Sequence, residues 1–69
     1  MIDPKVAELA RDWRAKAQSL DEYAARCRME GDTYEATEAE DAARDNWIAA
    51  DELEMAGSVE LYAALRQAS

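Results

Sequence analysis

The sequence predicts an all-α protein: an antiparallel helical hairpin of two long helices plus a short C-terminal helix, assembled as a dimer. Three observations predict this fold. Apolar side chains recur at seven-residue spacing in the first half of the chain, isolated glycines divide it at positions 31 and 57, and strong helix formers dominate the composition. A chain of 69 residues makes a single domain, residues 1–69.

The first helix is expected over residues 4–30. Asp3 is a suitable N-cap, Pro4 suits the first helical position, and Gly31 is placed to end the helix in a left-handed conformation. Alanine at one core position lets a partner helix approach closely, which favours a tight antiparallel pair. The core positions form two rows, each with a seven-residue repeat. One row carries the larger side chains Val6, Trp13, Leu20 and Cys27, and the other carries Ala10, Ala17 and Ala24.

The second helix is expected over residues 33–56. Asp32 and Glu35 have the spacing of a capping box, and Gly57 follows the last helical residue. The connection around Gly31 is very short, so the two helices should be antiparallel neighbours. One face of this helix is built from small side chains, with Trp47 at its border: Ala36, Ala39, Ala43, Ala50 and Leu53.

A short third helix is expected over residues 59–67, with Ser58 as its cap. Four of its side chains are apolar and must cover the open end of the hairpin or a second subunit: Val59, Leu61, Tyr62 and Leu65. Alanine makes up 16 of the 69 residues, so one chain has few large side chains to bury. With one cysteine and no histidine, neither a disulfide nor a zinc site can compensate, which leaves a homodimer as the expected remedy.

The excess negative charge lies in residues 31–57. This segment holds nine acidic residues and one basic residue, a difference of eight that equals the net charge of −8 of the whole chain. Such a surface repels phosphates, so we expect no direct contact with nucleic acid and no association with a membrane. It attracts a basic protein surface, mainly by raising the encounter rate and the selectivity. The functional surface is therefore expected in this segment.

The outer side of the second helix carries a second apolar row. At 100° per residue, Ile48 and Met55 point away from the alanine face and cannot enter the hairpin core. Either the third helix or a second copy covers them, or they form an exposed interaction patch. Trp47 belongs either to the core or to this patch. The candidate protein-binding residues are Tyr34, Glu38, Asp41, Asp45, Trp47, Ile48, Asp51, Glu52 and Met55.

Catalysis, cofactors and metals are not expected. Histidine, the commonest general base, is absent, and no base accompanies Ser19, Ser58 or Ser69. Cys27 lies on the apolar row of the first helix, where a thiol behaves as a small buried hydrophobe. A metal site would have to come from acidic residues of the second helix without a Glu-x-x-His motif, so a solvated acidic face is the preferred interpretation of Glu38, Asp41 and Asp45.

Three functional hypotheses follow. The first is an inhibitor or adaptor that docks on a host protein, using apolar residues for affinity and acids for steering. The second is a nucleic-acid mimic whose carboxylates replace phosphates. The third is a structural subunit of a small helical assembly. A mimic should have little apolar surface between its acids, and a structural subunit needs no concentrated charge, so Trp47, Ile48 and Met55 among the acids favour the first hypothesis.

The order of features along the whole chain resembles that of phage-encoded quorum-sensing anti-activators, small host-takeover proteins of Mu-like Pseudomonas phages. These features are the length of 69 residues, Asp3-Pro4, Glu30-Gly31-Asp32, Glu38-Ala39-Glu40-Asp41 and Trp47.

The resemblance implies a dimeric helical protein of the host cytoplasm that binds a LuxR-type transcription activator and blocks its access to DNA. It also points to a type IV pilus assembly ATPase as a second target, and it assigns no role to any single residue. Small anti-CRISPR proteins of similar phages share the description and stay an alternative.

Overall fold

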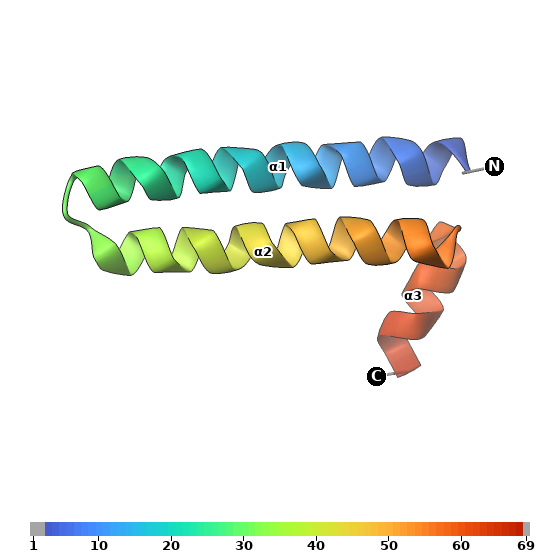
Figure 1. Cartoon of the computed structure of the whole chain (residues 1–69). Helices are drawn as coiled ribbons and strands as arrows, with labels where there is room; N and C mark the ends of the chain where they lie inside the picture. The colour runs from blue at the N-terminus through green and yellow to red at the C-terminus, as the bar shows by residue number, and fades with distance from the viewer. Residues whose placement is uncertain (1–2, 69) are drawn as a thin grey trace.

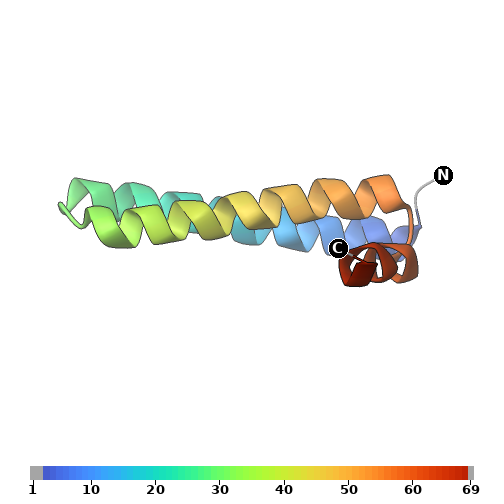
Figure 2. The ribbon, with the colours of Figure 1, turned by 90° about the horizontal axis from the view of Figure 1, so that it is seen from below.

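The computed structural model describes residues 3–68. Ser69, interpreted above as a serine without a catalytic partner, lies outside the described residues, as do Met1 and Ile2. Three helices follow one another: α1 (Pro4–Met29), α2 (Thr33–Ala56) and α3 (Val59–Ala68). The two long helices lie antiparallel and α3 turns away at their open end (Figure 1), which confirms the predicted hairpin and short third helix. Seen from below, α1 and α2 cross at a shallow angle (Figure 2).

Capping by Asp3 begins α1 as predicted. Its carboxylate accepts a hydrogen bond from the backbone N–H of Lys5 at 2.9 Å, and Pro4 occupies the first turn, where its missing N–H leaves no bond unmade. The helix ends at Met29, one residue earlier than predicted, with Glu30 as its C-cap.

A Schellman motif closes the turn between α1 and α2. Gly31 has a φ of +85°, a left-handed conformation that side chains with a Cβ rarely adopt. Its N–H bonds to the carbonyl of Arg28 at 3.1 Å, and the N–H of Asp32 bonds to the carbonyl of Cys27 at 2.8 Å. These two bonds satisfy the last carbonyls of α1 and reverse the chain at once.

The predicted capping box of α2 forms only in half. The carboxylate of Asp32 accepts the backbone N–H of Glu35 at 3.1 Å, as expected. The return bond to the Glu35 side chain is not made, because the N–H of Asp32 is already bonded to Cys27. The Glu35 carboxylate instead accepts the hydroxyl of Tyr23 at 3.2 Å and so links the two helices.

The second helix ends at Ala56 as predicted, and Gly57 follows it with a φ of +85°. The hydroxyl of Ser58 then accepts the backbone N–H of Leu61 at 3.1 Å, which begins α3. The third helix runs to Ala68, one residue beyond the predicted end.

The core between the long helices is a seam of alanines. Leu53 and Val6 are the largest fully buried side chains, and both lie in the cluster at the open end of the hairpin. The rest of the seam matches the small-residue rows predicted from the sequence. Its buried alanines are Ala10, Ala17 and Ala24 of α1, and Ala36, Ala39, Ala43 and Ala50 of α2.

The expected core position of Trp13 and Leu20 is wrong in part, because both side chains are only half-buried. With alanine on both sides of the seam the two backbones lie too close to admit an indole ring between them. Trp13 therefore lies at the side of the seam, where its ring meets Tyr62 of α3 at 5.7 Å between centroids. Cys27, also on this row, is buried as expected.

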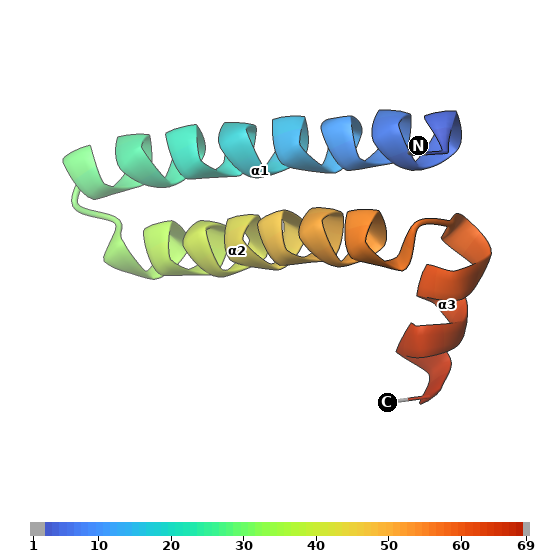
Figure 3. The same ribbon diagram turned by 45° about the vertical axis from the view of Figure 1, so that its right-hand side comes forward.

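Of the four large apolar side chains of α3, only two pack against the hairpin. Val59 and Tyr62 pack against the core cluster at the open end, whereas Leu61 and Leu65 are 57% and 62% exposed. Figure 3 shows why: α3 runs away from α2 rather than lying along it. The third helix therefore does not cover the outer side of α2.

The molecule exposes more surface than a compact protein of its size. Its radius of gyration is 14.2 Å, against about 11 Å for a compact domain of this length. Its accessible surface is 5089 Å², against roughly 4300 Å² for a monomeric protein of this mass. The dimensions of 43 × 25 × 11 Å explain the difference, since the hairpin is only one layer thick.

Candidate protein-binding site

The long helices present two different sides, which we call the polar flank and the groove flank. The polar flank carries Glu40, Trp47, Asp51 and Glu54 of α2 with their partners on α1. The groove flank carries Trp13 of α1, Asn46 and Ala49 of α2, and the junction with α3. At 100° per residue, Asn46 and Ala49 fall on the opposite side of the alanine seam from the α2 residues of the polar flank.

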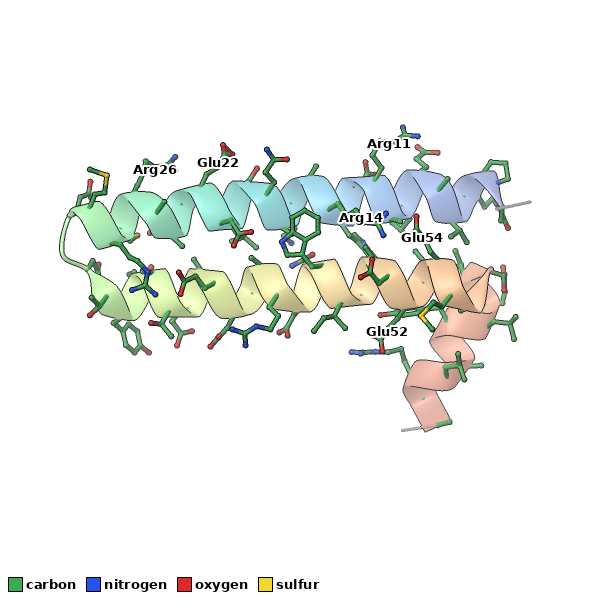
Figure 4. All side chains as sticks on the ribbon, in the orientation of Figure 1. Arg11, Arg14, Glu22, Arg26, Glu52 and Glu54 are labelled. Atoms are coloured by element: carbon green, nitrogen blue, oxygen red, sulfur yellow. The ribbon has the colours of Figure 1, made fainter. Side chains whose placement is uncertain are left out.

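Ion pairs between the helices neutralise the polar flank. The guanidinium of Arg14 donates to both carboxylate oxygens of Glu54, at 2.6 and 2.9 Å, and to Asp51 at 2.7 Å. Arg14 and Glu54 point toward one another in Figure 4. Nearer the turn, Nε of Arg28 donates to Glu40 at 3.0 Å. The arginines of α1 thus compensate the acids on this side of α2.

Hydrogen bonds shift the pKa values of the paired carboxylates and of Tyr23. Hydrogen bonds from Arg14 hold the pKa of Glu54 below its ordinary value, and those from Arg28 do the same for Glu40. The Cys27 thiol first, and the Glu35 carboxylate second, raise the pKa of Tyr23 to about 12. All these groups therefore keep their ordinary charge at neutral pH.

An open groove of about 600 Å³ lies on the groove flank and is lined by residues of α1, α2 and α3. We call it the acidic groove. Its α2 side is lined by Asp45, Asn46, Ile48, Ala49 and Glu52. Its remaining lining comes from Trp13 of α1 and from Tyr62 and Arg66 of α3. A second hollow of about 410 Å³ shares Glu52 and Tyr62 with it and adds Met55 and Leu65.

The acids of the groove belong to a row along the outer face of α2. Glu38, Asp45 and Glu52 follow one another at seven-residue spacing, about 10 Å apart along the helix. Within residues 3–68 no salt bridge engages any of the three. The uncompensated charge of α2 is therefore concentrated on this row.

Apolar side chains lie beside that row and are exposed. Tyr34, Ile48 and Met55 have 73%, 48% and 86% of their surfaces accessible. Asp41, between the first two of them, pairs with Arg44 of its own helix at 3.5 Å. The prediction that this row stays outside the hairpin core is confirmed.

The structure divides the nine predicted binding residues among three places. Asp45, Ile48 and Glu52 line the acidic groove, with Met55 in the adjoining hollow. Further toward the turn, the outer face of α2 holds Tyr34, Glu38 and Asp41. Trp47 and Asp51 lie on the polar flank, where the Trp47 indole N–H donates to Asp21 at 3.1 Å and Asp51 pairs with Arg14.

Sequence reasoning missed the part of the groove that other helices supply. The sequence predicts Trp13 in the core and Tyr62 over the open end of the hairpin or a second subunit, and it does not single out Arg66. The size conflict between an indole ring and an alanine seam was a signal that Trp13 would lie at the side. Nothing in the sequence showed the angle at which α3 leaves the hairpin.

Within residues 3–68, no three His, Cys, Asp or Glu side chains are arranged to hold a metal ion. No helix of that part of the chain has both the length and the apolarity to cross a membrane. No protein-family model, no curated protein and no solved structure matches the chain.

Proposed function

We propose that this protein binds a basic surface of a host protein through the outer face of α2 and inhibits that protein. The resemblance to phage quorum-sensing anti-activators points to a LuxR-type transcription activator as the target, kept from its DNA, and to a type IV pilus assembly ATPase as a second one. The site of action is then the cytoplasm of the host cell.

One observation carries the proposal: exposed apolar side chains lie next to acids that no salt bridge compensates. Ile48 and Met55 are accessible, and Asp45 and Glu52 flank them on the same face. Apolar anchors supply most of the affinity of an interface, whereas charges at its rim steer the encounter. A nucleic-acid mimic needs the charges without the apolar side chains between them.

The test separates these two contributions kinetically. Binding of the purified protein to a LuxR-type activator is followed in real time, together with release of the activator from its DNA. Ile48→Ala should speed dissociation by about thirtyfold, the ~2 kcal/mol expected of a buried anchor. Reversal of Glu38, Asp45 and Glu52 to lysine should instead slow association and reduce its salt dependence.

Two controls make the result specific. Met29→Ala removes a side chain that is 90% exposed near the turn, and it should leave binding unchanged. Reversing Glu8, Asp12 and Glu22 of α1 to lysine changes the net charge by the same amount as the α2 reversal. Because Glu22 points away from α2 (Figure 4), this control should slow association less than the α2 reversal does. If folded Ile48→Ala binds normally while the α2 reversal loses all affinity, the interface is electrostatic throughout and the nucleic-acid mimic becomes the better hypothesis.

A further inference from the structure

We propose that the acidic groove is a binding site for an arginine side chain, contributed by the basic surface of the partner protein. The inference rests on the proposed function only in naming a protein as the source of that arginine. The groove itself can be tested without any partner.

The residues of the groove are complementary to both the flat face and the N–H edge of a guanidinium group. Trp13 and Tyr62 present aromatic rings, tilted by 55° to one another, and a planar cation is attracted to such ring faces. Asp45 and Glu52 lie two turns apart on α2 along the same groove, and the carboxylate of either one suits the edge of a guanidinium as a hydrogen-bond acceptor. A volume of about 600 Å³ is within the range of roughly 300–1000 Å³ typical of small-ligand sites.

The chain itself shows that a guanidinium is accepted here. Arg66 of α3 lies over the Tyr62 ring, with 6.0 Å between its guanidinium carbon and the ring centroid. That contact occupies one aromatic ring of the groove, and no comparable cation–π contact to Trp13 occurs within residues 3–68. An incoming arginine would enter toward Trp13, Asp45 and Glu52 and would compete with Arg66.

Charge decides between a basic partner and a second copy as the occupant. The outer row of α2 is acidic in every copy, so two copies packed through it would place like charges together. Arginine is preferred to lysine, because its guanidinium is planar, stacks on aromatic rings and bonds carboxylates with two parallel N–H groups.

The experiment uses the two tryptophans as internal probes in NMR spectra of the full chain. N-acetyl-arginine amide is titrated into the protein, with N-acetyl-lysine amide and sodium chloride as parallel titrants. The Trp13 indole N–H signal should shift and saturate with the arginine compound, at least threefold more tightly than with the lysine compound. The Trp47 indole, which is bonded to Asp21 on the polar flank, should not move.

Matched variants assign the effect to the groove. Replacing Asp45 by Asn and Glu52 by Gln together should weaken arginine binding about tenfold. Glu8→Gln with Glu22→Gln removes the same charge on α1, outside the groove, and should cost less than twofold. Arg66→Gln, which removes the competing guanidinium, should tighten binding by more than Arg11→Gln does, and Arg11 projects from α1 away from α2 (Figure 4).

Equal Trp13 shifts with arginine, lysine and salt would overturn the proposal, as would undiminished binding by the folded Asp45/Glu52 variant. A Trp13 shift that grows with protein concentration alone would put a second copy in the groove and also overturn it. If arginine binds as expected but no basic protein does, the groove assignment stands and the proposed function fails. If a basic protein binds equally well to the Asp45/Glu52 variant, the groove assignment fails and the proposed function stands.

Discussion

The effect of a side chain on this hairpin depends on which side of the helix it occupies. Ala17 lies in the seam with none of its surface accessible, while Ala15, two residues earlier, is exposed. In the seam the absence of atoms beyond Cβ is what allows the two backbones to approach. An enlarged side chain there has no free volume to enter.

We expect Ala17→Leu to destabilise the fold by ~1–3 kcal/mol, the usual cost of overpacking a close-packed core. Ala15→Leu adds the same atoms on the exposed face and should change the free energy of unfolding by less than about 0.5 kcal/mol. Thermal and urea denaturation followed by circular dichroism measure both. Equal melting temperatures for the two variants would mean that the seam is assigned to the wrong face.

The ion pair between Arg14 and Glu54 makes stability depend on pH in the acid range. The folded state holds the pKa of Glu54 below its ordinary value of 4.5, so its contribution is fully present above that pH. This contribution to the free energy of unfolding is lost as the pH falls below 4.5 and through the lowered pKa of Glu54 in the folded state. The wild type should therefore be more stable than Glu54→Gln above pH ~5, and the difference should shrink as the pH falls below 4.5.

Melting temperatures of the two proteins across this pH range provide the measurement. Asp45→Asn is the control, because Asp45 takes part in no salt bridge within residues 3–68. A gap between wild type and Glu54→Gln that stays constant with pH would contradict the assignment.

At the scale of the elements, α3 depends on very few contacts. Tyr62 meets Trp13 and Val59 packs against the open end of the hairpin, while none of the side chains of α3 is fully buried. A ten-residue helix is not stable alone in water, so these contacts hold it in place.

Tyr62→Ala should release α3 and leave the hairpin folded, because the seam does not involve this helix. Amide hydrogen exchange should then become fast across residues 59–68 and stay slow in α1 and α2. Gln67→Ala, which truncates an exposed polar side chain on the same helix, is the control and should leave exchange unchanged. Loss of protection throughout the chain would show that α3 is part of one cooperative unit with the hairpin.

The sequence alone predicted the elements and their ends to within one residue. The reason is local: Asp3, Gly31, Asp32, Gly57 and Ser58 each determine a cap through a backbone bond or a left-handed φ. The alanine rows likewise predicted the facing sides of the two long helices.

The candidate site was less accessible to prediction, because it is assembled from three helices. The α2 acids and Ile48 follow from periodicity within one helix. The positions of Trp13 and Tyr62 depend instead on how closely the seam packs and on the angle of α3, which are tertiary properties. The capping box forms only in half because the turn already uses the Asp32 N–H for its bond to Cys27, and the Glu35 carboxylate accepts the Tyr23 hydroxyl of α1 instead.

For the whole molecule, the excess of surface is the main feature. A hairpin one layer thick exposes several hundred Å² more than a compact protein of this mass, and about 800 Å² per partner is buried in a standard interface. The exposed Leu61 and Leu65 lie on α3, whose charges cancel, so this helix can meet a second copy without repulsion between acids.

We expect a homodimer of twice the 7.7 kDa chain mass in light scattering at micromolar concentration. Leu65→Asp should convert it to a monomer, while Met29→Asp, at a more exposed position near the turn, should not. A wild-type monomer with a cooperative melt would refute the dimer. It would also leave the whole outer face of α2 and α3 open to other partners.

The burial of Cys27 has a practical consequence. The thiol is 5% exposed, lies in the cluster next to the turn, and is the only one in the chain. An aqueous thiol reagent can modify it only while α1 and α2 are apart at that end, so the rate of labelling under native conditions counts these openings. The rate of Cys27 labelling therefore reports how often the turn end of the hairpin opens, and whether a ligand bound at the far end slows that opening.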